Sequence, residues 1–489
     1  MRWFACLTAS LVGLSGAWAD PKPDVSGATD TIPLNDKGKA KNLRLPIVLF
    51  ENLVVTVPPA VVYWSTPNDQ KEDWALHWDW PSWKEKLGSA DALVLDTNRF
   101  EANAIRHPLV GALTYQIGRS NGMSPLLSTA MAFGTSFVWE YFVEFKEQPS
   151  VNDLVSNTTA GFLVGEPLFQ IGLLADRHGT PARRALALLV SPFHRAQKEL
   201  GLSPLVDQAA GPNRLEIHAG LHAVNRTNAH ATTTQVHVGL DLETFRDPWF
   251  GRAGEDAHGT GLAAWNRVAA EVDLGGPDER FAGAAFRSST TYAGLLARDL
   301  EVSGYGHQTF AGVGAGFEVV DRRLPGEWEK FASFELVNPR VAGWWHRPYG
   351  DLDLEAGVAA NVAMVQATAL ALDPLIPDSS VVLTRGYYYA TGATLQGRAR
   401  LRTGRWTAEV ESVAHQFWSF DEHSHGGTND PRDLADGRVT TSANLGVAPF
   451  GDDLRVELYG RSTIRRGTGD NLYRETRERE LGLALRTAF

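Results

Sequence analysis

The chain has 489 residues, with 46 Lys and Arg against 57 Asp and Glu, and a formal net charge of −11 at pH 7. This length permits two or more domains. The acidic balance, without a basic block interleaved with aromatic residues, argues against a nucleic-acid partner. The single cysteine is Cys6, so the rest of the chain can form no disulfide and offers no thiol nucleophile or cysteine metal ligand.

The first 19 residues have the features of a secretory signal peptide. Arg2 is positively charged, Trp3 to Gly16 is largely apolar, and Ala17-Trp18-Ala19 has the small-x-small pattern of a cleavage site. We therefore expect export, with a mature protein that begins at Asp20. Residues 20–89 are expected to form a linker and then an amphipathic, aromatic-rich segment.

Residues 90–205 are predicted to form a helical domain. Proline or serine stands at the start of several candidate helices, as in Ser124-Pro125, Ser150 and Thr180-Pro181. The candidate helices lie near 108–118, 124–146, 151–174 and 180–200. The uncharged window from Ser120 to Trp139 is long enough to cross a bilayer, but its Asn, Pro, Gly, Ser and Thr residues favour a buried or interfacial helix.

One candidate helix, within "PSVNDLVSNTTAGFLVGE", carries Asp153, Asn157, Gly161 and Gly165 at four-residue steps. Residues four apart share a helix face. We expect a packing seam, in which the glycines let a neighbouring helix around Trp139 and Glu140 approach closely. Asp153 and Asn157 would supply polar bonds there, and a functional role of the stripe is the second reading.

Three acidic residues, Glu140, Glu144 and Asp153, lie among apolar helical positions. Buried carboxylates are unfavourable unless they are paired, so Arg106, Arg119 or Lys146 are the expected partners. A general-acid role is the alternative, and it would require a raised pKa in a cleft.

From about residue 210 to 489 the pattern changes to strict alternation of apolar and polar residues. In "RLEIHAGLHAV", Leu215, Ile217, Ala219 and Leu221 alternate with polar residues, which is a strand signal. Twelve such segments are predicted, near 214–224, 235–243, 262–274, 285–302, 307–320, 329–345, 351–369, 385–401, 406–417, 437–448, 453–465 and 476–489.

Twelve long alternating segments predict a transmembrane antiparallel β-barrel, apolar toward lipid and polar toward the lumen. Short turns alternate with longer loops, the longest from Ser419 to Gly437, and an even count places both ends of the barrel in the periplasm. The segment from Phe245 to Gly261 does not fit, because a short turn is expected there. It is either a periplasmic excursion or a sign that the strand count is wrong.

The first hairpin can be given a register if it turns around Thr227 and Asn228. Arg214 would then lie opposite Asp241, and His218 opposite His237, both pairs inward. The last segment, "ERELGLALRTAF", resembles the C-terminal signal by which the barrel-assembly machinery recognises outer-membrane barrels; the residues that carry it are Leu481, Leu483, Leu485 and Phe489.

Three histidines, His218, His222 and His237, are predicted to face the lumen beside Glu216 and Asp241. They could bind zinc or activate a lipid-cleaving serine. The alternative, which we prefer, is that they only fill the polar interior of the barrel. "HSHGG", from His423 to Gly427, is interpreted as a solvated loop, and no metal or cofactor is predicted.

Within the helical domain, "RHPLVGALTYQIGRSNGMS", "FVWEYFVE" and "PSVNDLVSNTTAGFLVGE" resemble, in this order, the core of the bacterial domain-of-unknown-function family 3943. The resemblance covers about residues 90–180. It implies an envelope protein without an assigned activity, so no catalytic residue is carried over. The positions that match the family pattern are His107, Arg119, Glu140, Glu144, Asp153, Asn157, Gly161, Gly165 and Glu166.

The sequence thus predicts an α+β protein: a signal peptide, a periplasmic helical domain and an outer-membrane barrel. The leading hypothesis is that the helical domain caps or plugs a barrel that handles or gates a lipid or small solute, with outer-membrane lipids around it. The alternative is an outer-membrane lipid hydrolase, of deacylase or phospholipase type. Its candidate catalytic residues are His107, His218, His222 and His237.

Overall fold

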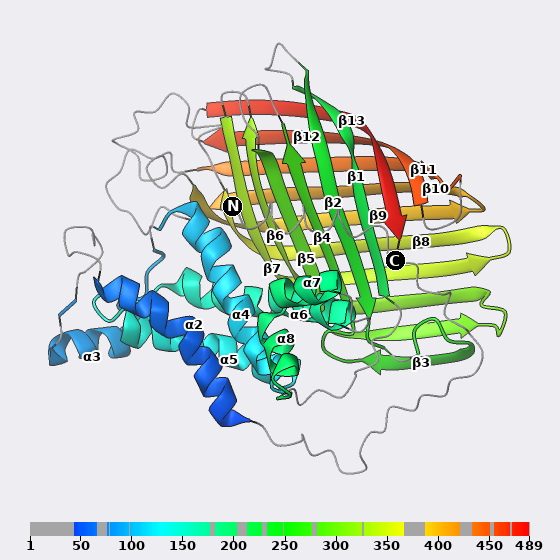
Figure 1. Cartoon of the computed structure of the whole chain (residues 1–489). Helices are drawn as coiled ribbons and strands as arrows, with labels where there is room; N and C mark the ends of the chain where they lie inside the picture. The colour runs from blue at the N-terminus through cyan, green and yellow to red at the C-terminus, as the bar shows by residue number, and fades with distance from the viewer. Residues whose placement is uncertain are drawn as a thin grey trace. The chain divides into compact units, whose positions relative to one another are not determined.

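The computed structural model divides into a helical unit within residues 29–209 and a strand unit from residue 210 onward, each described by itself (Figure 1). The predicted signal peptide with Cys6, the linker from 20 to 43, the motif from His423 to Gly427, and Phe489 lie outside the described residues. The described residues are 44–65, 76–77, 79–96, 98–176, 181–202, 213–226, 232–247, 249–275, 281–324, 327–365, 387–420, 433–449, 454–469 and 472–488.

The helical unit contains α-helices joined by short 3₁₀ and π-helical segments. Its elements are α2 (Leu45–Ser65), α3 (Trp80–Gly88), η2 (Ala90–Ala92), η3 (Ala102–Arg106), α4 (His107–Ser120), α5 (Pro125–Val138), η4 (Trp139–Val143), α6 (Val151–Asp176), α7 (Pro181–Val190) and α8 (Pro192–Glu199). Two of them, η3 and η4, are single π-helical turns.

The helix boundaries follow from capping and from proline. The Ser124 hydroxyl accepts a hydrogen bond from the Leu127 backbone N–H at 3.2 Å, and the Ser150 hydroxyl accepts one from Asp153 N–H at 3.1 Å, as expected for N-caps. The single helix predicted over 180–200 is wrong. It divides into α7 and α8 because Pro192 excludes helical backbone from the residue before it, and Ser191 has φ −142° and ψ 68°.

The small-residue stripe on α6 is a packing seam that faces two helices, of which only one was predicted. A Cβ at Gly161 would meet Ala132 of α5, in the predicted helix of 124–146, at 3.0 Å and the Gly111 carbonyl oxygen of α4 at 3.1 Å, whereas Gly165 packs against α4. A Cβ at Gly165 would lie 2.9 Å from the Ala112 carbonyl oxygen, and one at Gly111 of α4 would lie 2.0 Å from the Asn157 carbonyl oxygen. The side chain of Asn157 is hydrogen-bonded to α5, where its amide donates to the Ser136 hydroxyl at 3.0 Å.

In the part of the chain that the structure describes, two helices have the length and hydropathy of a membrane span, α2 and α6. In α6, 72% of the apolar window is buried inside the unit, which identifies it as the core helix. In α2 only 11% is buried. The helix α5 covers most of the uncharged window from Ser120 to Trp139 and continues directly into the π-helical turn η4.

The strand unit is a closed barrel of twelve antiparallel strands, with one additional short strand, β3. The predicted fold class and the count of twelve are confirmed. The strands are β1 (Asn213–Arg226), β2 (Thr233–Phe245), β3 (Gly254–Thr260), β4 (Trp265–Leu274), β5 (Phe281–Leu300), β6 (Gly306–Leu324), β7 (Glu327–Arg347), β8 (Gly350–Val365), β9 (Tyr388–Thr403), β10 (Trp406–Ser419), β11 (Ala435–Val447), β12 (Leu454–Gly469) and β13 (Leu472–Ala488).

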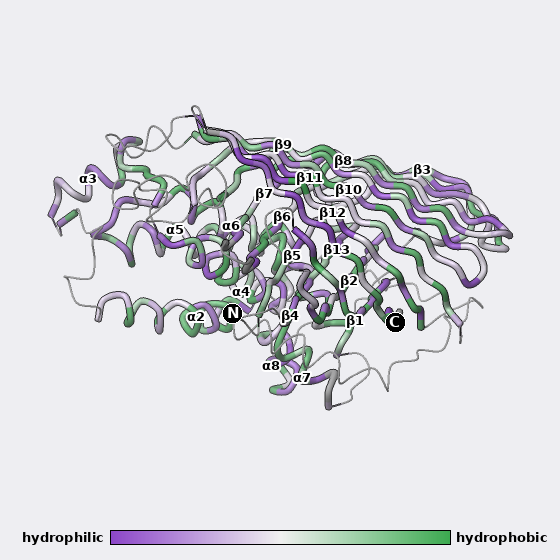
Figure 2. The backbone as a smooth tube through the Cα atoms, turned by 90° about the horizontal axis from the view of Figure 1, so that it is seen from above, coloured by the Kyte–Doolittle hydropathy of each residue, from purple (hydrophilic) through white to green (hydrophobic). Residues whose placement is uncertain are grey.

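Closure is made by β1, which pairs with both β2 and β13. Along the strands, hydrophilic and hydrophobic residues alternate (Figure 2). Leu221 and Leu481 are 58% and 61% exposed on the outer face, whereas Glu216 and Arg400 are almost fully buried on the inner one. The barrel is therefore apolar outside and charged inside, as the alternation predicted.

The predicted register of the first hairpin is wrong by two residues. Arg214 pairs with Glu243, and His218 lies opposite Gly239. A shift of two residues leaves every side chain on its predicted face, because the side-chain period of a strand is two. The expected inward positions of Arg214 and His218 are thus unaffected.

The unexpected segment from Phe245 to Gly261 contains a connection and the short strand β3, and β3 and β4 together act as one interrupted strand. Both pair with β5: β3 pairs with Gly294–Leu300, and β4 pairs with the earlier residues Phe281–Thr290. The break between β3 and β4 contains Ala263 at φ 59°. The connection after β2 is therefore only Arg246 to Ala253, and the strand count is unaffected. Among the described strands, β8 ends at Val365 and β9 begins at Tyr388, and β10 ends at Ser419 and β11 begins at Ala435.

The α4–α6 seam gives a first prediction. Replacing Gly111 by Ala should destabilise the helical unit by about 1–3 kcal/mol, because the new methyl group collides with backbone rather than with a flexible side chain. Gly134→Ala in α5 is the matched control: a Cβ there meets nothing within 4 Å, so it should stabilise by up to about 1 kcal/mol. Thermal unfolding followed by far-UV circular dichroism would measure both, and equal melting temperatures would contradict the seam.

Candidate functional site

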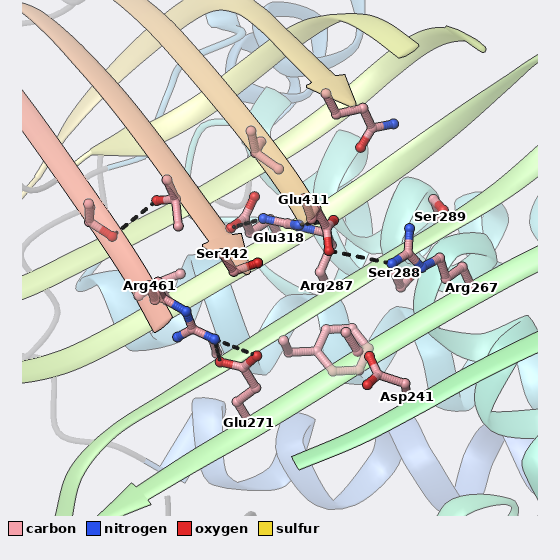
Figure 3. Close-up of a pocket in the computed structure, with 18 of the residues that line it drawn as sticks. Asp241, Arg267, Glu271, Arg287, Ser288, Ser289, Glu318, Glu411, Ser442 and Arg461 are labelled. Carbon is pink, nitrogen blue, oxygen red and sulfur yellow. Dashed lines mark hydrogen bonds and ion pairs between the residues drawn. The ribbon is translucent and has the colours of Figure 1, made fainter. Parts of the chain in front are cut away.

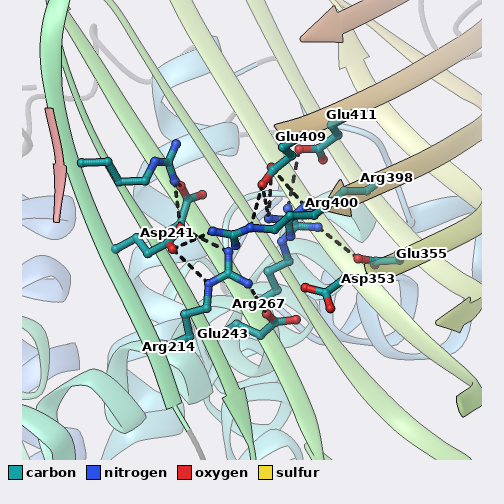
Figure 4. Close-up of polar contacts among 12 residues, drawn as sticks. Arg214, Asp241, Glu243, Arg267, Asp353, Glu355, Arg398, Arg400, Glu409 and Glu411 are labelled. Atoms are coloured by element: carbon teal, nitrogen blue, oxygen red, sulfur yellow. Dashed lines mark hydrogen bonds and ion pairs between the residues drawn. The ribbon is translucent and has the colours of Figure 1, made fainter. Parts of the chain in front are cut away.

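The barrel lumen is crossed by arginine–carboxylate pairs that join strands on opposite walls. Arg267 of β4 donates to Glu355 of β8 at 3.2 Å, and Arg400 of β9 donates to Glu216 of β1 at 2.9 Å (Figure 4). Further cross-lumen pairs are Arg287–Glu411, Arg461–Glu271, Arg322–Glu480 and Arg438–Glu329. These strands are not neighbours in the sheet, so the pairs connect the walls through the middle of the barrel.

The space left between these side chains is small. A cavity of about 150 Å³ lies in the lumen and is bordered by Arg267, Glu271, Arg287, Glu411 and Arg461 (Figure 3). Sites for drug-sized ligands usually have volumes of about 300–1,000 Å³. This cavity has room for water or a small ion.

Apolar layers lie on either side of the charged layer. At the end where β1 begins, Phe245, Trp265, Phe310 and Trp344 form a buried cluster. Phe250, from the connection between β2 and β3, stacks on Phe245 with ring centroids 3.7 Å apart. The segment that did not fit the turn pattern thus contributes to an aromatic layer at this end of the barrel.

A second buried cluster lies toward the opposite end of the strands. Its members include Phe331 near the start of β7, Val365 at the end of β8, and Phe417 near the end of β10. Phe417 follows Glu411 at an even spacing on the same strand, so both side chains lie on the lumenal face. Ion pairs such as Arg287–Glu411 therefore lie between two apolar clusters, whereas Arg438–Glu329 lies at the second one, with the Arg438 guanidinium 5.9 Å from the Phe331 ring centroid.

The three predicted lumenal histidines lie together in a buried chain of polar contacts. The Nε2 atoms of His218 and His237 are 2.9 Å apart, and His237 Nδ1 is 2.8 Å from Asp273 Oδ1. His222 Nε2 lies 3.0 Å from Gln235 Oε1. Asp273 lines the lumen as well, and the alternation alone did not single it out.

The contacts of the three histidines bear on the alternative of a lipid hydrolase. Among the described residues, no serine or threonine hydroxyl is hydrogen-bonded to His218, His222 or His237, whereas an activated nucleophile requires such a contact with its base. The imidazoles contact each other, an amide and carboxylates. The contacts fit the polar-filling interpretation of the histidines.

In the helical unit, Arg119 and Glu166 form a buried ion pair between α4 and α6. Arg119 Nε donates to Glu166 Oε2 at 2.7 Å, and the two side chains are 4% and 0% exposed. Tyr115 and Gln170 also donate to this carboxylate, each at 2.7 Å. Arg119 therefore pairs with Glu166. The sequence analysis had suggested Glu140, Glu144 or Asp153 as its partner.

Those three acids gather near His107 instead. His107 Nε2 lies 3.4 Å from Asp153 Oδ2, and Glu140 Oε2 accepts a hydrogen bond from Ser150 N–H at 2.9 Å. Burial raises the pKa of Glu140 to about 8. Burial also raises the pKa values of Glu144 and Asp153 well above their ordinary range, and the neighbouring acids add to the effect.

Two residues of this region were not predicted. Asp96, between η2 and η3, lies within 4.8 Å of the ligand atoms of His107 and Asp153. Lys86 of α3 is 1% exposed, and its ammonium donates to the backbone carbonyls of Glu144, Phe145 and Glu147. No sequence motif marks either residue.

The residues of the C-terminal segment lie in β13. Leu481, Leu483 and Leu485 are exposed on the outer face, and Phe489 lies outside the described residues. Their role as an assembly signal stays a prediction.

Comparison with known families agrees with the resemblance carried by the motifs. Residues 92–193 match the family model described as "Domain of unknown function (DUF3943)". The match covers helices η3 to α7 in full and leaves the barrel unmatched. No curated protein matches the chain.

Several solved structures are similar to more than half of the chain. The outer membrane channel DcaP of Acinetobacter baumannii is 9% identical, with 57% of this chain and 96% of that chain covered and a TM-score of 0.23. The β domain of the Bordetella autotransporter BrkA is 12% identical, with 56% and 99% covered and a TM-score of 0.20. The NanC porin is 7% identical, with 54% and 98% covered and a TM-score of 0.23. Likenesses this weak carry no functional conclusion.

The buried Arg119–Glu166 pair gives a second prediction. Glu166→Gln should destabilise the helical unit by about 3–5 kcal/mol, because it leaves the Arg119 guanidinium buried without a counter-charge. The control is Glu199→Gln, which removes the exposed i,i+4 partner of Arg195 and should change stability by less than about 1 kcal/mol. Denaturant unfolding would compare the variants, and similar midpoints would show that Glu166 does not balance Arg119.

Proposed function

We propose that the chain is an outer-membrane β-barrel of a Gram-negative cell envelope that handles or gates a lipid or small solute, and that the structure corresponds to its closed state. The observation that carries the proposal is the pattern of cross-lumen ion pairs. An apolar outer face suits contact with outer-membrane lipids, and a charged inner face suits passage of polar solutes. Opposite walls joined by Arg267–Glu355 and Arg400–Glu216 make passage conditional on a rearrangement.

Opening by separation of ion pairs is physically accessible. A buried pair gains attraction but loses hydration of both partners, so its net contribution to stability is small. Water or a charged solute that enters the lumen can replace the partner of each charge. Such pairs can therefore separate when a solute competes for them, which a tightly packed apolar core cannot do as easily.

We further propose that the helical unit caps the periplasmic end of the barrel. The support comes from chain connectivity. The helix α8 ends at Glu199 and β1 begins at Asn213, so the unit is attached by 13 residues to the end of the barrel where the aromatic layer of Phe245 and Phe250 lies. A link of this length spans at most about 45 Å when extended, which gives the unit a high effective concentration at that end.

The closed-lumen proposal predicts the behaviour of an arginine variant. Arg287→Ala removes the contacts to Glu318 and Glu411 and should raise single-channel conductance in planar bilayers several-fold over the wild type. The openings should favour cations, because Glu318 and Glu411 each lose one positively charged partner and the lumen becomes more negative. Arg466→Ala is the control, since Arg466 is an exposed arginine paired with Glu475. Wild-type conductance from an assembled Arg287→Ala barrel would contradict the proposal.

The cap proposal predicts the effect of a deletion. Removing residues 90–202 should increase uptake of small solutes and sensitivity to antibiotics that the outer membrane normally excludes. Heat-modifiable migration on gels would verify that the shortened barrel is assembled. An assembled barrel with unchanged permeability would remove the cap from the proposed function and leave the lumenal closure untouched.

A further inference from the structure

A cluster of potential metal ligands lies in the helical unit, where no ligand was predicted from the sequence. Three side chains contribute: Asp96 from the segment after η2, His107 at the first residue of α4, and Asp153 in the first turn of α6. Each offers one ligand atom, and these atoms all lie within 4.8 Å of one another. We propose that Asp96, His107 and Asp153 bind a divalent transition metal ion.

The distances suit such an ion. His107 Nε2 and Asp153 Oδ2 are 3.4 Å apart. At metal–ligand distances of about 2.0–2.2 Å, two ligands of a tetrahedral ion lie about 3.3–3.6 Å apart. One imidazole with carboxylates favours zinc, cobalt, manganese or ferrous iron over calcium or magnesium, which prefer oxygen ligands alone.

Neighbouring amides hold the two carboxylates in place. The Asn152 side-chain amide donates to Asp153 Oδ1 at 3.0 Å and to Asp96 Oδ1 at 3.2 Å. The Asn103 side-chain amide donates to Asp96 Oδ1 at 2.5 Å. Hydrogen bonds of this kind to ligating carboxylates are typical of metal sites, where they orient the ligands.

A second observation, independent of the three ligands, points to a missing cation. Glu140 is 2% exposed, and its Oε1 atom has no hydrogen-bond partner among the described residues. Its carboxylate interacts electrostatically with both Asp96 and Asp153, so it lies against the cluster. Buried carboxylates occur when they are paired or coordinate a metal, and the nearby Lys86 ammonium is already directed at three backbone carbonyl oxygens.

The backbone around the cluster is also unusual. Both π-helical turns of the unit border it, since η3 ends at Arg106 directly before His107, and η4 carries Glu140. Single π-helical turns inside helices occur frequently at functional sites, because the inserted residue re-aims the side chains beside it. These turns place His107 and Glu140 toward the same cluster.

The experiment measures cobalt and zinc binding by the full-length protein in detergent. After treatment with chelator and dialysis against Zn²⁺, we expect about one zinc ion per chain by elemental analysis. Co²⁺ should give visible d–d absorption, and either ion should raise the unfolding temperature of the helical unit. Asp153→Asn and His107→Gln should each lose this binding at least tenfold, whereas the control His77→Ala, at an exposed histidine outside the cluster, should retain it.

Three outcomes would overturn the proposal. One is a wild-type protein without stoichiometric metal or cobalt absorption. Another is undiminished binding by folded Asp153→Asn and His107→Gln variants, which would assign the ion to another site, such as the lumenal His218 and His237. The third is a metal that leaves the unfolding temperature of the helical unit unchanged. If the two variants do not fold, a His237→Gln variant decides the matter, because it should retain the stoichiometry, the spectrum and the metal-dependent unfolding temperature only if the ion is bound in the helical unit.

Discussion

Charges that face the inside of a narrow barrel have to be neutralised within it. Each ion that leaves water for a protein interior loses hydration worth several kcal/mol. In this barrel the arginines of one wall meet the acids of the opposite one, as Arg461 meets Glu271 and Arg322 meets Glu480. The pairing that makes the charged lumen tolerable is the same pairing on which the proposed closure rests.

The layered lumen follows from this constraint. Salt and water weaken ion pairs that they can reach, so the pairs last only where solvent is limited at both ends. The aromatic layer around Phe245 and the second cluster around Phe417 provide that limitation. Phe250 explains why the connection after β2 is longer than a turn, because a two-residue turn could not return a ring to the lumen.

Much of the barrel could be predicted from the sequence because its signal is local. The alternation of Leu215 and Ile217 with Glu216 and His218 specifies both strand and face. The register error of two residues does not change the face to which each side chain is assigned, because the side-chain period of a strand is two. The residue that pairs with Arg214 on the neighbouring strand could not be predicted, because it depends on the length of the first hairpin loop.

Partners across space were not predictable in this way. That Arg400 faces inward follows from alternation, but that it meets Glu216 depends on which strands oppose each other after closure. Likewise, Gly161 and Gly165 indicate that another backbone approaches their helix closely, but they do not identify that backbone. For this reason α4 was missed as a neighbour. Asp96 was missed because it lies 57 residues before Asp153 and outside any motif.

The two units deal with buried charge in opposite ways. In the lumen each acid of the cross-wall set has an arginine, so the charges balance within the fold. In the helical unit Arg119 already balances Glu166, and Lys86, which attracts Glu140, donates its hydrogen bonds to carbonyl oxygens. Among the described residues, the acids around Asp153 therefore outnumber the cations near them. Such an excess is stable only with added protons or an added cation, and this is why the proposed metal site lies in the helical unit and the proposed gate in the barrel.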